Sequence, residues 1–503
     1  MSVIGLDLGT SGVRAVAFAS DGDVRGAASA ELALLRDGTG RVELEAAEII
    51  TAAEDVVRRA AQQAAAAGDP VQGIGFSVLG EAVVPIDETG APVARVAVSM
   101  DTRGTEVAAA VGEILGEGRF TAITGQPLHG MFSLFKIMAG DAAWAGAAGY
   151  RCVGDLLAER WSGVAAIDLG QAARTGMLDV DSGEWSAEIL RAAAVSAPWV
   201  RAERLPVPVA SGSVIGVVRE EAAGALGIAP GTPLVAGTHD QAAAFLGAGG
   251  EPGVRSVIAL GSSDCLTVGS RVRPEGLGGT GFASYRVDDE LWVTLAGTAA
   301  GGWALEWLAG LLNRDVADVF GTLSDVPPAL LVLPYLAGSG TLDNDPAARG
   351  TIHGVTLDTT VAELARAVVE AAGFEFHKII AALRAHDVEV SALHVTGAGA
   401  ENADALAARA AAAGASLTPV GRDASARGAA MLALRGIGGD PTPLRLEPSG
   451  PTPAGAGADD AFAGWYAGQR AAYTALYEAM RALNPHLNSR PQPHDPSHIR
   501  RRT

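Results

Sequence analysis

Two apolar runs near the start of the sequence are joined by a short polar turn, which constrains the fold more than any other segment. Val3–Leu6 and Val13–Phe18 flank Asp7-Leu8-Gly9-Thr10-Ser11-Gly12, a pattern that predicts two antiparallel strands and a hairpin. The glycines at 9 and 12 let backbone N–H groups come close to a ligand. The turn is therefore either an ordinary glycine-rich hairpin or a site that holds phosphate.

Polar side chains in and beside this turn are of the kinds that a phosphate site would use. Thr10 and Ser11 add hydroxyl donors, and Arg14 lies just beyond them. Asp7 ends the first strand, where its carboxylate would hold Mg²⁺ through water. We therefore expect Gly9, Thr10, Ser11 and Arg14 to bind phosphate and Asp7 to bind the metal ion.

Composition and periodicity predict an α/β protein. Of the 503 residues, 49% are hydrophobic but only 5% are aromatic, so the core consists mainly of Ala, Val and Leu. Residues 1–32 predict a three-stranded antiparallel meander, residues 45–67 a helix and residues 71–77 a strand. This order continues along the chain and predicts mixed sheets covered by helices.

The net charge of −20 argues against partners that require a positive surface. Nucleic acid and anionic membranes both require one, so we expect neither. The two cysteines, Cys152 and Cys265, are too far apart in the sequence to indicate a disulfide framework or a zinc site. We expect a soluble, cytoplasmic protein, because neither a signal segment nor an 18-residue apolar stretch is evident; a homodimer is one option for its assembly.

Several enzyme classes are excluded by the motifs. Lys136 and Lys378 are the only lysines, and neither follows the glycines of a P-loop, so a P-loop NTPase is excluded. The same lysines do not fit the nucleotide-binding strand of a protein kinase. The sequence also contains neither Gly-x-Ser-x-Gly nor His-Glu-x-x-His, which leaves little support for a serine hydrolase or a zinc protease.

A second hairpin pattern repeats the first. Residues 255–263 form an apolar run that ends in Gly261, Ser262 and Ser263, which predicts a second phosphate-facing turn. This weak internal repeat indicates two similar domains that share a cleft. Asp264 follows directly, and its carboxylate would repel phosphate unless it points away.

Two further segments place polar residues where a strand meets a helix. Asp240 follows the strand-like run Leu234–His239 and precedes a helix, so it is either a reacting group or a helix N-cap. Gly397-Ala398-Gly399-Ala400-Glu401-Asn402 lies between a strand and an alanine-rich helix. This turn is either ordinary loop chemistry or a nucleotide contact.

These segments occur in the same order as in the FGGY carbohydrate kinases, which the chain resembles from residue 3 to about residue 437. Residues 7–11 resemble the first phosphate loop of that family, and residues 237–241 the segment that carries its catalytic base. Residues 259–263 resemble the second phosphate loop, and residues 397–402 the adenosine-contacting turn. Residues 333–350 are similar to the stretch that precedes the family's last helices.

The resemblance implies two ribonuclease H-like domains of the actin and sugar-kinase type, with ATP in the cleft between them. Residues 1–248 would form the N-terminal domain and residues 249–486 the C-terminal domain, with a disordered tail at residues 487–503. The implied reaction is ATP-dependent phosphorylation of a hydroxyl of a small linear sugar or polyol, with Asp240 as general base and Asp7 on Mg²⁺. The nucleotide contacts implied in the second domain are Gly261, Ser262, Ser263, Gly302, Gly397, Ala398, Gly399 and Asn402.

The predicted sugar site departs from the family pattern. Many relatives have Gln-Met-His-Gly or Gln-Arg-Glu where this chain has Val78-Leu79-Gly80-Glu81, so only Glu81 matches. We expect Glu81, Asp101 and Gln241 to bind sugar hydroxyls, because carboxylates and amides form paired hydrogen bonds with polyols. The alternative for Glu81 is a solvated loop carboxylate.

The substrate is the least constrained part of the prediction. Ser99 stands where the family usually has Trp, and His129 and Phe132 are candidates to replace that apolar wall. A xylulokinase-like ketose kinase is the leading prediction, and a kinase for another pentulose, hexulose, polyol or sugar acid is the alternative. A nucleotide-switch protein of the actin or chaperone type, or a non-catalytic sugar sensor, would belong to a different class.

Overall fold

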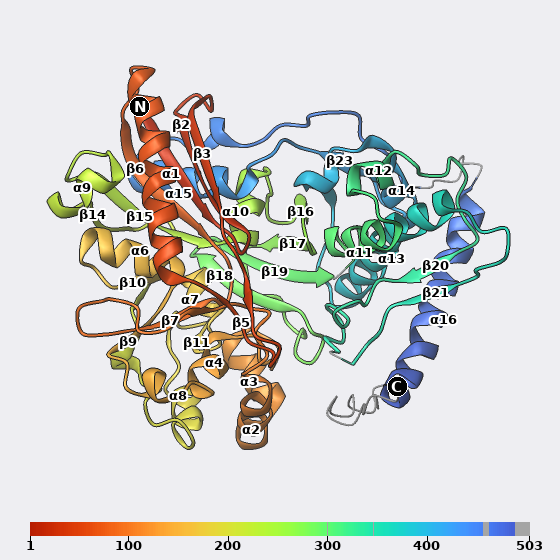
Figure 1. Cartoon of the computed structure of the whole chain (residues 1–503), viewed down its shortest axis with the longest axis horizontal. Coiled ribbons are helices and arrows are strands. Elements are labelled where there is room, and N and C mark those ends of the chain that lie inside the picture. Colours follow the sequence, from red (N-terminus) through yellow and green to blue (C-terminus); the bar gives the residue numbers. More distant parts are fainter. Residues whose placement is uncertain (299, 346, 456–461, 488–503) are drawn as a thin grey trace, which may run out of the picture.

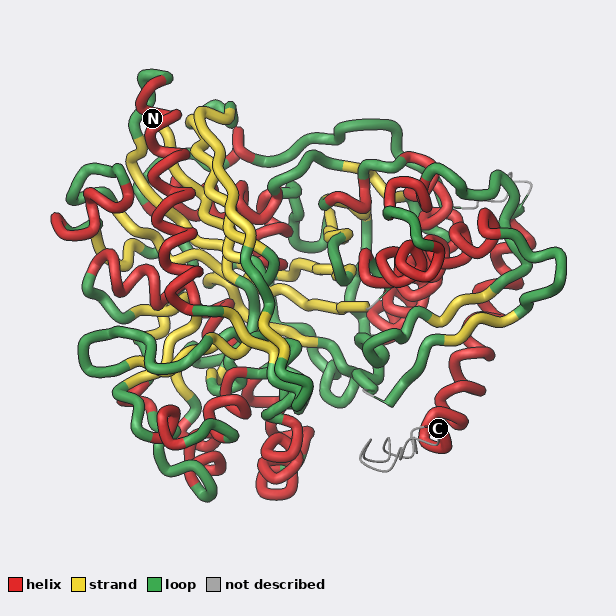
Figure 2. Tube along the Cα trace, viewed as in Figure 1, coloured by secondary structure: helices red, strands yellow, loops and turns green. Residues whose placement is uncertain are grey.

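The computed structural model describes residues 1–298, 300–345, 347–455 and 462–487 (Figure 1). Two six-stranded sheets form its framework, and helices pack around them (Figure 2). The first sheet has the order β14-β15-β6-β1-β2-β3. Its strands are β1 (Ser2–Leu8), β2 (Gly12–Ala19), β3 (Val24–Glu31), β6 (Val71–Val78), β14 (Val214–Val217) and β15 (Pro233–His239). Strands β1, β2 and β3 pair antiparallel, which confirms the predicted meander.

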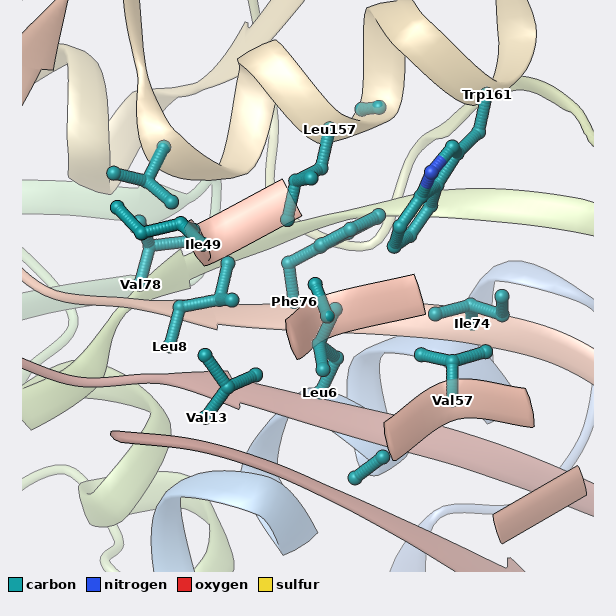
Figure 3. Close-up of a cluster of buried hydrophobic side chains, with 14 of the residues drawn as sticks. Leu6, Leu8, Val13, Ile49, Val57, Ile74, Phe76, Val78, Leu157 and Trp161 are labelled. Atoms are coloured by element: carbon teal, nitrogen blue, oxygen red, sulfur yellow. The ribbon is translucent and has the colours of Figure 1, made fainter. Parts of the chain in front are cut away.

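Helix α1 (Ala46–Ala66) covers one face of the first sheet. Its buried residues Ile49, Ala53, Val56 and Val57 recur at helical spacing and form the apolar stripe that the sequence predicts. Figure 3 shows Ile49 and Val57 packed with side chains from β1 and β6, together with Trp161 of α6 (Val153–Ser162). Burial of these side chains stabilises this half of the molecule.

The second sheet has the order β18-β19-β17-β16-β22-β23. Its strands are β16 (Arg255–Leu260), β17 (Asp264–Ser270), β18 (Ala283–Asp288), β19 (Leu291–Thr298), β22 (Ala392–Thr396) and β23 (Leu417–Pro419). Strands β16 and β17 form an antiparallel hairpin, and β22 pairs parallel with β16. The helices of this half include α11 (Gly302–Leu312), α12 (Val316–Phe320), α13 (Val361–Ala385) and α14 (Ala403–Ala413).

The last helix, α16 (Ala463–Leu487), is attached by buried tyrosines. Tyr466 donates to Glu370 at 2.7 Å, and Tyr473 donates to Glu375 at 2.7 Å. Both glutamates belong to the long helix α13, so α16 packs against the second half. Residue 487, the first of the predicted tail, is the last residue of α16, and residues 488–503 lie outside the described residues.

Helices α10 (Asp240–Gly247) and α15 (Ala424–Gly436) cross in backbone contact. A Cβ atom on Gly428 would lie 1.9 Å from the carbonyl oxygen of Ala243, and one on Gly247 would lie 2.0 Å from that of Ala424. Helix α15 also packs on β1 and β6 of the first sheet. It therefore follows the predicted boundary at residues 248–249 yet covers a face of the first sheet.

A smaller five-stranded sheet and several short helices carry the loops of the first half. The sheet has the order β4-β5-β8-β7-β9, with β4 (Leu35–Arg36), β5 (Val42–Leu44), β7 (Val83–Ile86), β8 (Val96–Ala97) and β9 (Gly149–Cys152). Helix α6 follows β9 directly, because it begins at Val153.

The remaining elements are α2 (Thr105–Leu115), α3 (Glu117–Thr124), α4 (Ser133–Met138), α5 (Ala142–Ala145), α7 (Leu169–Ala173), α8 (Ala187–Ala194), α9 (Glu220–Leu226), β10 (Ala166–Asp168), β11 (Leu178–Asp179), β12 (Glu184–Trp185), β13 (Val207–Val209), β20 (Leu331–Leu333) and β21 (Thr351–His353). In the described part of the chain, every helix is too short or too polar to span a bilayer.

Candidate active site

The first hairpin turn is held at the end of β1 and β2. The N–H of Gly9 donates to the carbonyl of Gly12 at 2.9 Å, which closes the turn and leaves Thr10 and Ser11 at its tip. Asp7 lies one residue before the end of β1, and its Oδ1 accepts from Ser77 Oγ on β6 at 2.6 Å. Burial raises the pKa of Asp7 to about 6, although the Ser77 hydrogen bond opposes this shift.

Arg14 is paired with a residue from the far end of the chain. It lies opposite Asp7 in the hairpin register, and its Nη2 donates to Asp423 Oδ2 at 2.9 Å. A second contact of 2.7 Å joins its Nε to Asp423 Oδ1, and Asp423 immediately precedes α15. Arg14 therefore places a positive charge beside Asp7, and that charge is already paired with a carboxylate.

Asp240 is the first residue of α10, where the strand β15 ends. The N-cap is His239, and the alternative that Asp240 caps the helix through its side chain is wrong. Its Oδ1 is buried and has no hydrogen-bond partner among the described residues. Burial, then the nearby charges of Asp7 and Glu81, raise the pKa of Asp240 to about 7. His239 Nε2 lies 3.1 Å from this oxygen without forming a hydrogen bond. A buried carboxyl with a pKa near neutrality fits a general base.

The pKa of Asp240 predicts how activity depends on pH. We expect kcat/KM for the sugar to fall below an apparent pKa near 7, because protonated Asp240 cannot accept the proton of the substrate hydroxyl. The profile is measured from about pH 5 to about pH 9 at saturating ATP. A flat profile down to the acidic end of this range would contradict the assignment.

Glu81 lies in a strained turn next to this carboxyl. Its φ is 62°, a left-handed conformation that costs a non-glycine residue free energy and is common at functional sites. Its carbonyl oxygen accepts from Ser133 Oγ at 3.0 Å and from Lys136 Nζ at 2.9 Å. The side chain is buried, and its Oε1 accepts from Arg174 Nε at 2.5 Å. The alternative of a solvated loop carboxylate is therefore wrong.

Three polar residues of this pocket were not predicted from the sequence. Arg174 also donates from Nη1 to Gln126 Oε1 at 2.7 Å, and Lys136 is fully buried beneath the turn. Burial lowers the pKa of Lys136 to about 7. The scarcity of lysine, with two in the chain, was the one sequence signal for Lys136. Arg174 and Gln126 stand in segments without a recognisable motif.

Phe132 and His129 flank the Glu81 turn. The Phe132 ring lies under the Arg174 guanidinium, 5.2 Å from ring centroid to Cζ. His129 accepts at Nδ1 from the N–H of Met131 at 3.2 Å. Burial lowers the pKa of His129, although the charge of Glu81 opposes this shift. The structure thus brings both residues beside Glu81. They are the two residues that the sequence analysis gives as candidates to replace the missing apolar wall.

Asp101 and Gln241 differ in the hydrogen bonds that they already make. The two oxygens of Asp101 accept from Val42 N and from Arg103 N, Nε and Nη2, at 2.7–3.0 Å. Asp101 is thus committed to this network, and its contact with a sugar hydroxyl stays a prediction. Gln241 follows Asp240, and its buried Oε1 is without a hydrogen-bond partner in the described structure, so it retains an acceptor for a ligand.

The predicted nucleotide segments meet at the ends of β16 and β22. Gly261, Ser262 and Ser263 form an exposed turn between β16 and β17, and the N–H of Gly302 donates to Gly261 O at 2.8 Å. A Cβ atom on Gly397 would lie 2.4 Å from Leu260 O, so the turn with Ala398 and Gly399 packs directly on the second hairpin. Asn402 Oδ1 accepts from Ala405 N at 2.8 Å and caps α14.

The donors near the first hairpin fit a magnesium ion that arrives with a nucleotide. Among the described residues, no group of three His, Cys, Asp or Glu could hold a metal ion alone. Mg²⁺ in phosphotransferases is held by one or two carboxylates together with substrate phosphates. Asp7 supplies an oxygen donor of this kind, and one of its carboxyl oxygens accepts from Ser77.

Two hairpin turns on two similar sheets, with a free strand-end carboxylate between them in the sequence, define a two-domain sugar-kinase fold of the actin and hexokinase type. A family model for the N-terminal domain of the FGGY family of carbohydrate kinases matches residues 2–247, and the model for the C-terminal domain matches residues 256–437. The chain belongs to this family, whose members are phosphotransferases.

Relatives with different substrates match the chain over most of its length. It is 30% identical to a glycerol kinase from Citrifermentans bemidjiense over 422 residues, covering 80% of this chain and 83% of that protein. A xylulose kinase from Staphylococcus xylosus is 24% identical over 412 residues, with 80% and 83% covered. A gluconokinase from Bacillus subtilis is 26% identical over 421 residues, with 78% and 79% covered.

Solved structures show the same fold. The crystal structure of xylulose kinase from Rhodospirillum rubrum superposes with a TM-score of 0.85 at 23% identity, covering 96% of this chain and all of that one. This likeness establishes the two-domain architecture.

Proposed function

We propose that this protein transfers the γ-phosphoryl group of Mg-ATP to a hydroxyl of a small linear sugar or polyol, with a ketose such as xylulose as the leading substrate. The observation that supports this function is the carboxyl of Asp240, which lies close to both Asp7 and Glu81 and has an unpartnered oxygen. Because ATP is a substrate, we propose that the protein acts in the cytoplasm.

In this proposal each group of residues has one task. Glu81 and Gln241 orient the substrate hydroxyls, and Asp240 accepts the proton of the attacking hydroxyl. Asp7 holds Mg²⁺ through water, and the ion supplies charge neutralisation at the transferring phosphoryl group. The N–H groups of the two hairpin turns orient and stabilise the phosphates.

The charges of the pocket favour a neutral substrate over a sugar acid. Arg174 is paired with Glu81, and Arg103 is paired with Asp101 and Glu43. Both guanidinium groups are therefore neutralised by carboxylates of the chain. To pair with either of these guanidinium groups, a substrate carboxylate would have to displace a buried partner and leave it unpaired, which is costly.

A coupled ADP-release screen over ketoses, aldoses, polyols and sugar acids tests this function. We expect turnover with a neutral linear ketose or polyol and none with gluconate. Turnover of gluconate alone would overturn the assignment of a neutral substrate. Failure with every compound would favour a sugar sensor or a nucleotide switch instead.

The role of Asp7 can be tested separately from sugar binding. Asp7→Ala is expected to raise the Mg²⁺ concentration needed for half-maximal activity by about tenfold or more, because it removes a carboxylate that holds the ion. Sugar affinity, measured by calorimetry without nucleotide, should stay within about twofold of the wild-type value. An unchanged Mg²⁺ requirement would contradict the role.

Glu81→Gln tests the sugar contact. The variant should change the order of kcat/KM among the substrates, because an amide presents both a donor and an acceptor where the carboxylate presents acceptors. It should also lower the apparent pKa of the acid limb, because the charge of Glu81 raises the pKa of Asp240. An identical substrate order with an unshifted pH profile would remove Glu81 from the site.

A further inference from the structure

A buried histidine stands directly before the proposed base, and the proposed transfer gives it no task. His239 is the last residue of β15 and the N-cap of α10, and its side chain makes no capping hydrogen bond. The residue is 5% exposed, so neighbouring groups enclose its ring. A buried imidazole has two polar nitrogens, and each of them needs a partner.

Each ring nitrogen of His239 contacts a different side chain. Nδ1 lies 2.7 Å from the hydroxyl oxygen of Tyr285 on β18, and the two atoms share a hydrogen bond. Nε2 lies 3.1 Å from Oδ1 of Asp240, in an electrostatic contact without a hydrogen bond. The two aromatic rings meet edge to face, with centroids 6.0 Å apart. The imidazole therefore connects Tyr285 to the base.

Close packing leaves the two rings little room to rotate. A Cβ atom on Gly80 would lie 2.7 Å from Nε2 and 3.0 Å from Cδ2 of His239, so the backbone before Glu81 packs directly on the imidazole. Tyr285 is fully buried. A Cβ atom on Gly170 of α7 would lie 3.4 Å from Cε2 of Tyr285, so α7 lies against the tyrosine ring.

The contact with the carboxylate determines which nitrogen of His239 carries the proton. Burial, together with the charge of Arg174, lowers the pKa of His239 well below its ordinary value, so the ring is neutral and has one N–H. An ionised Asp240 attracts Nε2 at 3.1 Å only if that N–H is on Nε2. Nδ1 is then the acceptor, and the Tyr285 hydroxyl donates to it. The hydrogen bond at one nitrogen thus sets the proton at the other.

We propose that Tyr285 and His239 are positioning residues that hold the carboxyl of Asp240 in the orientation required for proton transfer. The Tyr285 hydroxyl fixes the imidazole, and the Nε2 edge of the imidazole fixes Oδ1. Tyr285 belongs to the second sheet, whereas His239 and Asp240 lie where a strand of the first sheet ends. One half of the molecule therefore positions the base that the other half carries. This inference rests on the proposed function, because it takes Asp240 to be the general base.

Tyr285→Phe removes the hydroxyl and keeps the ring. The variant should lower kcat by about tenfold or more, because a base that is not held in place is less often aligned with the substrate hydroxyl. The KM values for the sugar and for Mg-ATP should stay within about twofold of the wild-type values, since neither positioning residue is assigned a substrate contact. Wild-type kcat in this variant would overturn the proposal, whatever the change in KM.

A double-mutant cycle tests whether Tyr285 acts through His239. His239→Gln should also lower kcat, because a flexible amide does not bridge the tyrosine hydroxyl and Asp240 as the fixed ring does. Adding Tyr285→Phe to His239→Gln should then change kcat by less than about twofold, since the link is already broken. If the two losses multiply instead, the residues act independently and the proposed link is wrong.

The matched control is Tyr150→Phe. Tyr150 is 2% exposed, and its hydroxyl donates to the carbonyl oxygen of Trp144 at 2.6 Å, so this substitution also removes one buried hydrogen bond. Tyr150 lies on β9 and has no part in the proposed transfer. Its variant should lower the Tm about as much as Tyr285→Phe does and keep kcat within about twofold. An equal loss of kcat would show that the effect is one of general stability and would overturn the proposal.

Two further measurements separate this inference from the proposed function. If the wild-type protein phosphorylates no compound of the screen, or if Asp240→Asn keeps the wild-type rate, the proposed function or its base assignment fails, and the inference fails with it. If the wild type is active and Asp240→Asn is not, wild-type kcat in Tyr285→Phe defeats the positioning residues alone.

Discussion

Replacing Asp240 by Asn is expected to lower kcat by about 10²–10⁴-fold, because the amide cannot accept the proton of the attacking hydroxyl. Asn preserves the size of the side chain, and the first residue of α10 does not depend on it for capping. The rate is measured by coupled ADP release with the best substrate of the screen. Sugar binding, followed by calorimetry, should change far less than the rate.

A matched control for this variant is Asp155→Asn. Asp155 is also buried, with both carboxyl oxygens unpartnered among the described residues, and burial raises its pKa well above the ordinary value. It lies on α6 and has no part in the proposed transfer, so its amide should keep kcat within about twofold. The base assignment would be wrong if Asp240→Asn kept more than about a tenth of the wild-type rate.

The second large effect concerns the crossing of α10 and α15. Gly428→Ala should lower the free energy of unfolding by about 1–3 kcal/mol or more, because the added methyl group would overlap Ala243 and force the helices apart. The loss should occur even though alanine is favoured over glycine in a helix by about 1 kcal/mol. Equilibrium unfolding in urea measures the change.

Gly310→Ala is the matched control. Gly310 lies inside helix α11, and a Cβ atom there would have nothing within 4 Å. This variant should therefore gain stability, by up to about 1 kcal/mol, from helix propensity alone. Equal effects of the two substitutions would show that the close helix contact does not limit stability.

Local patterns were sufficient to predict much of the framework. Each successful prediction depends on residues that are near one another in the sequence. Examples are the glycine turn after Asp7, the similar turn at Gly261 and the helical spacing around Ile49. Such contacts depend on backbone conformation and on which face of an element is apolar. The α/β fold was predicted correctly for this reason, and the family was predicted correctly from the resemblance of the ordered motifs.

Contacts between distant segments could not be predicted in the same way. Arg174 reaches Glu81 from α7, and Lys136 reaches the same turn from α4. These pairings depend on how whole elements pack, and no local sequence pattern encodes that packing. Asp101 differs, because three of its four hydrogen bonds come from Arg103, two residues along the chain, and only the bond from Val42 joins distant segments.

The position of α15 also governs how the protein is made. Its residues Ala426, Ala430 and Met431 pack against Val3 and Phe18 on one face of the first sheet. Synthesis proceeds from the N-terminus, so every strand of that sheet is synthesised well before helix α15. Until α15 is made, Val3 and Phe18 lack these packing partners, although Leu246 of α10 already lies against the same cluster. The core on this face of the sheet is therefore complete only once residues 424–436 have been synthesised.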